Sequence, residues 1–173
     1  RSGTEIASGF SFLPGDSLAD NWYVVTHAPN FDVLRGFRNS LLVSAASTLL
    51  VGYFSALTAY AFAFYRFKGR DFLFTVILLF MMVPGQLSLI GFYDEVKAMG
   101  LVDSYAPLIL PGIASSGTVF FLRQYILSTL PRSILEAPRI DGAGELLIFH
   151  RIVLPIMMPG IATMSIGAFI GSW

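Results

Sequence analysis

Four long stretches of this chain contain no charged side chain. Asp, Glu, Lys and Arg are absent from 40–65, 72–93, 104–122 and 152–173, and most residues in these stretches are apolar. About 20 apolar residues in a helix match the thickness of the hydrocarbon core of a bilayer. One such run fits the buried core of a soluble domain, but four do not. We therefore predict an all-α membrane protein, a polytopic bundle of transmembrane helices.

The composition supports this class and excludes others. Charged residues make up 13% of the chain, whereas about 25% is usual for a soluble domain. The formal net charge is zero, so nothing indicates a nucleic-acid partner. The chain has no cysteine, which rules out disulfide frameworks and cysteine-based metal sites. We expect no metal site, because neither His27 nor His150 belongs to a metal-binding motif, and we expect both histidines on the surface.

The hydrophobic pattern predicts four spans, the last of them truncated. They cover about 40–65, 72–93, 105–125 and 155–173. In the first span Ser55, Ala59 and Ala63 recur every four residues. This spacing gives a face of small side chains that either packs closely on another helix or reflects composition alone. In the second span Pro84 should kink the helix. Gly167 and Gly171 in the fourth have the G-x-x-x-G spacing, which often occurs by chance.

The distribution of Lys and Arg predicts the orientation. Seven of these residues lie in the connections 66–71 and 123–154, and four lie in the N-terminal segment and the 94–104 connection. The positive-inside rule therefore places 66–71 and 123–154 in the cytoplasm. Residues 1–38 would form an extracytoplasmic or interfacial segment, with Trp22 and Tyr23 as headgroup anchors, and 39–173 the transmembrane domain.

A polar island, "EAPRIDGAGELLIFHRIVLP" at 136–155, lies within the long inner loop of 127–154. Ser133 and Glu136 have the spacing of a capping box, and Gly142 suits a turn. Apolar residues at spacings of three and four predict a second short helix before Pro155. The predicted helix-turn-helix is either a hairpin lying on the membrane surface or a docking element for a cytoplasmic partner. The position of Pro138 is unexplained, because proline is unfavourable inside a helix.

The island resembles a known signature. Glu136-Ala137, Gly142 and Ile152-x-Leu154-Pro155 are similar to the E-A-A, G, I-x-L-P motif of the membrane permeases of binding-protein-dependent ATP-binding-cassette importers. Pro138 stands where the motif commonly has Ala. Further stretches are similar to the carbohydrate branch, the maltose and glycerol-phosphate type permeases. They are Pro84-Gly85-Gln86, Gly100-Leu101-Val102-Asp103-Ser104, Phe121-Leu122-Arg123-Gln124-Tyr125 and Gly171-Ser172-Trp173.

The resemblance covers about residues 36 to 173 and implies a function. The loop would be a coupling helix that docks into a cytoplasmic ATP-binding-cassette ATPase. The docking residues carried over from the motif are Glu136, Ala137, Asp141, Gly142, Ile152, Leu154 and Pro155. The other implied partners are a second permease subunit and an extracytoplasmic solute-binding protein, besides membrane lipid. ATP would be bound and hydrolysed by the ATPase, so the chain itself would be no enzyme and hold no cofactor; indeed, it has no G-x-x-x-x-G-K-S/T motif.

Polar residues inside the spans are candidates for the substrate pathway. They are Gln86, Ser88, Ser115, Ser116 and Thr118. Sugar hydroxyls need such neutral donors and acceptors, but hydrogen bonding between helices explains the serines and the threonine equally well. The alternative substrates are amino acids, polyamines or phosphate, carried by permeases of the same superfamily. A membrane scaffold without transport leaves the spaced signature unexplained.

The resemblance also implies a multi-pass location in the plasma membrane of a prokaryote. The sequence has no initiator Met and stops within an apolar run at Trp173. Since members of the carbohydrate branch usually have more spans, we expect one span before Arg1 and one or more after Trp173.

Overall fold

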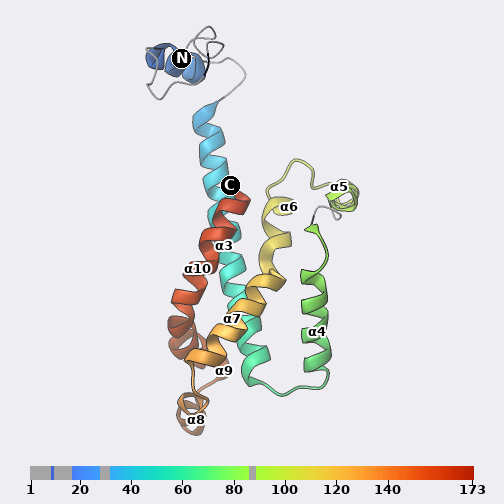
Figure 1. The fold of residues 1–173 in the computed structure, drawn as a ribbon, viewed down its shortest axis with the longest axis vertical. Coiled ribbons are helices and arrows are strands. Elements are labelled where there is room, and N and C mark those ends of the chain that lie inside the picture. Colours follow the sequence, from blue (N-terminus) through green and yellow to red (C-terminus); the bar gives the residue numbers. More distant parts are fainter. Residues whose placement is uncertain (1–8, 10–16, 28–31, 86–88) are drawn as a thin grey trace. The chain divides into compact units, whose positions relative to one another are not determined.

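The computed structural model describes residue 9 and residues 17–27, 32–85 and 89–173, and these residues form helices and connections without a strand. The elements are α2 (Leu18–His27), α3 (Val33–Phe64), α4 (Arg70–Met81), α5 (Leu89–Ala98), α6 (Ala106–Ile109), η2 (Leu110–Ala114), α7 (Ser116–Thr129), α8 (Ser133–Ile140), α9 (Glu145–Ile148), η3 (Phe149–Val153) and α10 (Leu154–Ser172). The prediction of an all-α protein is confirmed (Figure 1).

The chain divides into two compact units, Arg1–Leu41 and Leu42–Trp173. In the first unit the described helix α2 buries no residue, and both predicted anchors, Trp22 and Tyr23, are exposed. That exposure is compatible with a headgroup location, which stays a prediction. The second unit contains the functional candidates.

The core of the second unit lies where α3, α7 and α10 meet the polar island. Small residues allow α3 to pack closely at this point, and Ser55, Ala59 and Ala63 are all buried. A Cβ added to Gly52 would lie 3.0 Å from Ile161 Cγ2 of α10. The first span therefore uses its small face for helix packing, as one of the two readings of the sequence predicts.

Three apolar helices are long enough to cross a membrane among the described residues. They cover Val33–Phe64, Ala106–Thr129 and Glu145–Ser172. The first begins before the expected residue 40, the second extends past 125, and the third covers the expected span of 155–173 as far as Ser172. The prediction of a polytopic helical membrane protein is therefore confirmed.

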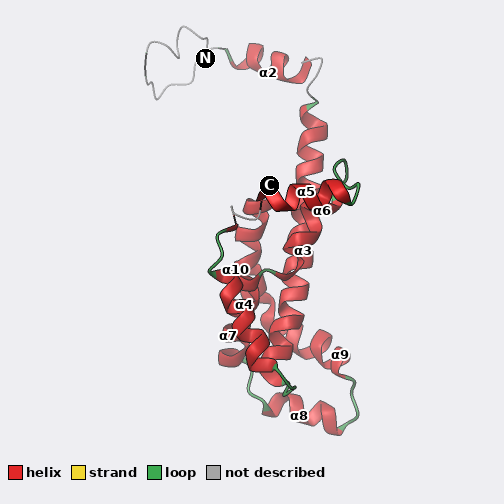
Figure 2. Cartoon of the chain, turned by 90° about the vertical axis from the view of Figure 1, so that its right-hand side faces the viewer, coloured by secondary structure: helices red, strands yellow, loops and turns green. Residues whose placement is uncertain are grey.

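The expectation of one kinked helix over 72–93 is wrong. Helix α4 ends at Met81, and α5 begins only at Leu89. Proline has no N–H to continue the ladder, and it disfavours helical backbone at the residue before it. Pro84 therefore breaks the helix here, where we expected a bend. Figures 1 and 2 show α4 and α5 as separate helices with different directions.

The third apolar stretch is also interrupted. It consists of α6, the 3₁₀ turn η2 with Pro111 and Gly112 at its centre, and α7. Ser115 has extended backbone with ψ of 117° and caps α7 by accepting a bond from the Thr118 N–H at 3.5 Å. Gly112, in this interruption, lies close to α3, because a Cβ added to it would be 3.4 Å from Val51 Cγ2.

Candidate functional site

The polar island begins within α8, and a tight turn follows this helix. The Ala143 N–H donates to the Pro138 carbonyl at 2.9 Å, and the Gly142 N–H donates to the Arg139 carbonyl at 3.1 Å. Gly142 has a φ of 79°. These two bonds around a left-handed glycine form a Schellman motif, a common C-terminal cap of a helix. The predicted turn at Gly142 is confirmed.

The start of α8 differs from the expected capping box. Arg132 is the N-cap residue, it makes no side-chain capping bond, and Ser133 already lies in the first turn of the helix. Pro138 lies inside the helix, where its missing N–H removes one hydrogen bond of a regular ladder. Pro138 lies three residues before the cap residue Asp141. Its carbonyl accepts the Ala143 N–H, the hydrogen bond of the Schellman motif that spans more residues, and in this way Pro138 helps to close the turn.

The second helix of the island is not a separate short helix. Helix α9, the π-helical η3 and α10 follow one another without a gap. The Leu154 N–H bonds to the carbonyl of Phe149, five residues earlier. Pro155 cannot donate to the ladder, and this wider turn precedes it. The end of the island therefore leads directly into the last apolar helix.

The predicted docking residues fall into two groups. Glu136, Ala137, Asp141 and Gly142 are exposed on α8 and its turn. Ile152 and Leu154 are half-buried and pack against the core, while Pro155 is exposed in the first turn of α10. The first group forms the outer end of the island, and the second forms its connection to α10.

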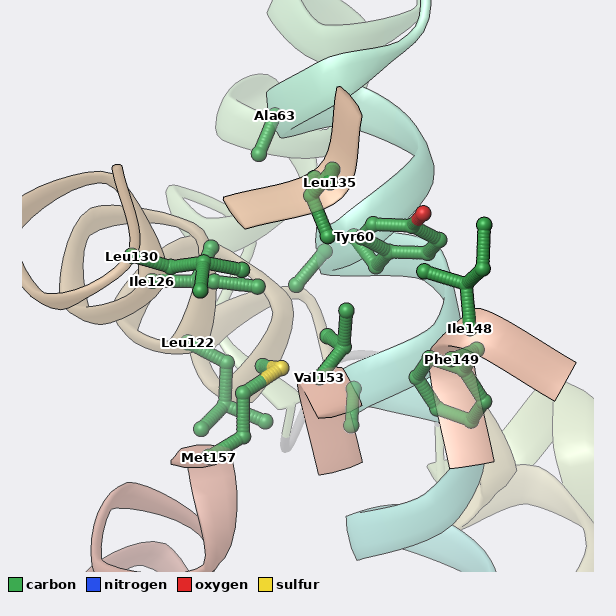
Figure 3. Packing of buried hydrophobic residues seen from close by; sticks show 12 residues of the cluster. Tyr60, Ala63, Leu122, Ile126, Leu130, Leu135, Ile148, Phe149, Val153 and Met157 are labelled. Atoms are coloured by element: carbon green, nitrogen blue, oxygen red, sulfur yellow. The ribbon is translucent and has the colours of Figure 1, made fainter. Parts of the chain in front are cut away.

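The island rests on an apolar base contributed by several helices. Leu135 of α8, Ile148 of α9 and Phe149 of η3 are almost fully buried. They surround Tyr60 of α3, whose ring centroid lies 5.7 Å from that of Phe149 (Figure 3). Burial of these large side chains holds the island against the membrane helices, because each contributes about 1.5–3 kcal/mol when fully buried.

The carboxylate of Glu145, which was not among the predicted site residues, joins the island to α3. Glu145 Oε2 accepts a hydrogen bond from the Tyr60 hydroxyl at 3.0 Å and another from the Tyr65 hydroxyl. Arg139 Nε of α8 donates to Glu145 Oε1 at 2.8 Å. Glu145 is the last acidic residue of the chain and adjoins an apolar span. A carboxylate next to an apolar span is a candidate for pairing, but the sequence does not show which residues are its partners.

The same network raises the pKa values of two of its donors, Tyr65 and Arg139. Burial raises the pKa of the Tyr65 phenol, and its hydrogen bond to Glu145 raises it further. The hydrogen bond to Glu145 likewise raises the pKa of the Arg139 guanidinium. Both groups therefore stay protonated and act as donors to the carboxylate.

Two of the five pathway candidates line one cavity. Ser115 and Thr118 border a cavity of about 370 Å³ between α3, α6, η2, α7 and α10, together with Ser47 and Ser172. Thr118 is only 4% exposed. Ser116 is half-buried and does not line this cavity. Gln86 and Ser88 lie outside the described residues. Gly167 and Gly171 also line the cavity, and a Cβ on either would meet nothing within 4 Å.

The two basic connections lie together at one end of the second unit. Arg66 and Arg70, from the connection after α3 and the start of α4, share a cavity of about 500 Å³ with Arg132, which precedes α8. Figures 1 and 2 show α8 at this end, and α5 and α6 at the opposite end. The structure thus brings 66–71 and the island to the same side of the second unit, which is the arrangement that the positive-inside prediction requires.

The two histidines make local contacts. His27 stacks on Tyr23, with ring centroids 4.2 Å apart, and His150 bonds to the Leu146 carbonyl at 2.7 Å and to the Tyr53 hydroxyl at 3.0 Å. Both side chains are exposed, as expected. Within the described residues, His, Asp and Glu do not gather in groups of three that could hold a metal ion.

Comparison with known proteins gives a consistent result. A family model described as "Binding-protein-dependent transport system inner membrane component" matches residues 48–173. The chain is 41% identical over 139 residues to the arabinooligosaccharides transport system permease protein AraQ of Bacillus subtilis, covering 80% of this chain and 49% of the relative. It is 33% identical over 168 residues to the sn-glycerol-3-phosphate transport system permease protein UgpE of Brucella abortus, covering 94% and 59%.

A solved structure has the same fold. It is a bacterial ABC transporter involved in the import of the acidic polysaccharide alginate, with a TM-score of 0.82 and 26% sequence identity. The superposition covers 99% of this chain and 60% of the other. This chain thus spans between about half and three fifths of the length of the proteins it matches.

Proposed function

Because this chain belongs to the family of binding-protein-dependent transport system inner membrane components, we propose that it forms part of the translocation pathway of an ATP-driven importer for sugars. The observation that carries the proposal is the exposed turn around Gly142 at the end of α8, which is followed by α9, η3 and α10 without a break between these three elements. The names of the relatives, which refer to arabinooligosaccharides and glycerol phosphate, favour sugars and related compounds over amino acids, polyamines or phosphate.

The island is the docking element for a cytoplasmic ATPase. Glu136, Ala137, Asp141 and Gly142 form the exposed end that enters the ATPase. Ile152, Leu154 and Pro155 connect this end to α10. A second permease subunit and an extracytoplasmic solute-binding protein complete the importer. This chain supplies no ATP site, so ATP is bound and hydrolysed by the ATPase.

Transport follows from rigid-body movement of the helices that the island contacts. When two ATPases close on ATP, the docked turns move, and the attached spans alternate between inward and outward access. The cavity bordered by Ser115 and Thr118 lies between three of these helices. Its hydroxyls can exchange hydrogen bonds with those of a sugar. Gln86, Ser88 and Ser116 stay candidates for the same pathway.

The orientation belongs to the same proposal. The protein is a multi-pass component of a prokaryotic plasma membrane, with 66–71 and the island in the cytoplasm and residues 1–38 outside. The adjacency of Arg66, Arg70 and Arg132 supports a common side for the two basic connections.

A cysteine crosslink tests the docking. Residues 1–173 contain no cysteine, so Gly142→Cys introduces a single thiol into this part of the permease; the full-length permease, with any cysteine elsewhere replaced by serine, is co-expressed with its ATPase. We expect a crosslinked product with an ATPase that carries a single cysteine in its docking groove. The control is Lys97→Cys in the 94–104 connection, which should give no such product. Absence of a crosslink from position 142, with the complex expressed and assembled, would falsify the docking role.

A further inference from the structure

The Glu145 carboxylate binds side chains from both sides of the junction between the island and α3. Tyr60 belongs to α3 and Tyr65 follows its last residue, whereas Arg139 belongs to α8. The two tyrosines are 85 and 80 positions away from Glu145 along the chain. Oε2 accepts from both phenols and from Arg139 Nη2 at 3.3 Å, and Oε1 accepts from Arg139 Nε.

This connection differs from the apolar contacts around it. Contacts such as that of Phe149 with Tyr60 are non-directional, so they allow neighbouring helices to shift by small amounts. Hydrogen bonds to a charged group are directional and about twice as strong as bonds between neutral groups. The carboxylate therefore fixes the position of α9, and with it the turn at Gly142, relative to the end of α3.

We propose that Glu145 is a positioning residue that makes α3 move with the docking turn. The island then drives two spans, α10 through the continuous chain and α3 through the Glu145 carboxylate. This inference rests on the proposed function and adds a second route for transmission. Without it, the covalent paths from the turn lead forward through η3 to α10 and back through α8 to α7, and neither leads directly to α3.

The chemistry of the site requires a carboxylate. Three donor side chains converge on it, and both of its oxygens accept hydrogen bonds. A glutamine has one acceptor oxygen, so its NH₂ group would face either the phenols or Arg139. Glu145→Gln should therefore keep part of the network, Tyr65→Phe should remove one donor, and Glu145→Ala should remove every bond. The variants form a graded series.

The test uses the full-length permease in the complete importer, reconstituted in lipid vesicles with its ATPase. Two quantities are measured: co-purification of the ATPase, and the number of substrate molecules transported per ATP hydrolysed. We expect unchanged co-purification throughout the series. Glu145→Ala should lower the transport-to-hydrolysis ratio by about tenfold, the scale set by hydrogen bonds to a charged group. Glu145→Gln and Tyr65→Phe should give smaller losses, by about two- to fivefold.

Matched controls are available at sites away from the island. Glu95→Gln removes the charge of an exposed glutamate in α5, and Tyr105→Phe removes the hydroxyl of an exposed tyrosine before α6. Both should leave the ratio unchanged. Hydrogen exchange of the peptide covering 133–148 adds a direct readout, since release of the carboxylate should speed exchange in α8 and α9 while the ATPase remains bound.

The possible outcomes separate this inference from the docking proposal. If the wild-type permease binds no ATPase, the proposed function fails. If it binds and transports normally, and Glu145→Ala keeps the wild-type ratio, the positioning role is wrong. Loss of ATPase binding in Tyr65→Phe and Glu145→Gln also overturns it, because Glu145 would then serve only to fold the docking surface.

Discussion

Gly160 of α10 lies directly against the ring of Tyr125 of α7. A Cβ built on Gly160 would come within 2.9 Å of Tyr125 Cδ1 and 3.0 Å of Cγ. Gly160 is buried, and the Tyr125 ring is itself stacked on Phe121, with centroids 6.4 Å apart. The inner edge of the ring therefore has little freedom to move away, and α10 can approach α7 this closely only because position 160 has no side chain.

Gly160→Ala should destabilise the contact between α7 and α10. Overpacking of a filled interface costs about 1–3 kcal/mol, which outweighs the higher helix propensity of alanine. We expect a lower melting temperature of the purified full-length permease in detergent, measured by intrinsic fluorescence. Tyr125→Leu should remove part of the clash, so the double variant should lose less stability than the sum of the single variants.

The matched control for this prediction is Gly117→Ala. Gly117 lies in the first turn of α7, and an added Cβ would meet nothing within 4 Å. Its melting temperature should stay within the error of the wild type or rise slightly. An equal loss of stability in both variants would show that glycine propensity, and not the Tyr125 contact, explains the effect.

Sequence reasoning predicted the helical class because membrane spans have a strong local signal. Runs such as 40–65 must form helices in lipid to satisfy their backbone groups. It was wrong for 72–93, where the length of the apolar run suggested one helix and the local effect of Pro84 was underestimated. Close contacts were also unpredictable. The G-x-x-x-G pair at Gly167 and Gly171 lines a cavity, whereas Gly52 and Gly160, which no motif marks, make the tight helix contacts.

The candidate site was predictable where its determinants are local. The turn at Gly142 depends on one residue with positive φ, so the pattern around it was sufficient. The network of Glu145 depends on Tyr60 and Tyr65, more than 75 positions earlier in the chain. Long-range pairs of this kind arise only when the helices pack, and a single sequence contains no record of them. The pathway cavity has the same limitation, since its residues come from five elements.

The predicted orientation can be tested with two cysteines. Lys68 and Lys97 are both exposed, in the connection after α3 and at the end of α5. We expect a membrane-impermeant maleimide to label Lys97→Cys in intact spheroplasts, and to label Lys68→Cys only after permeabilisation. Residues 1–173 contain no cysteine, so the permease without either substitution, with any cysteine outside these residues replaced by serine, provides the unlabelled control. The opposite pattern would reverse the positive-inside assignment.

Thr118→Val tests the cavity as a part of the substrate pathway. The substitution removes a hydroxyl and keeps the branched shape. If that hydroxyl bonds to the transported sugar, half-saturation of uptake should need about five- to tenfold more substrate, as expected for the loss of one hydrogen bond. Co-purification of the ATPase should be unaffected.

The control for Thr118 is Thr163→Val in α10. The Thr163 side chain is exposed and donates to the carbonyl of Pro159 in its own helix at 2.9 Å. This variant should transport with wild-type affinity. Unchanged half-saturation in Thr118→Val as well would leave Thr118 with a role in helix packing only.

Gly142 and Gly144 provide a matched pair for the docking turn. Neither would meet another atom within 4 Å if a Cβ were added, so space does not distinguish them. Their backbones do, because Gly142 has a φ of 79° and Gly144 has a φ of −66°.

A β-branched residue is strongly disfavoured at positive φ, so Gly142→Val should abolish transport in vesicles. Membrane insertion of this variant, checked by maleimide labelling of Lys97→Cys, should stay normal. Gly144→Ala should transport at nearly the wild-type rate. Gly142→Asn should restore part of the activity, since asparagine tolerates this conformation better than other residues with a side chain. Normal uptake by Gly142→Val would mean that the turn is not needed in this form for coupling.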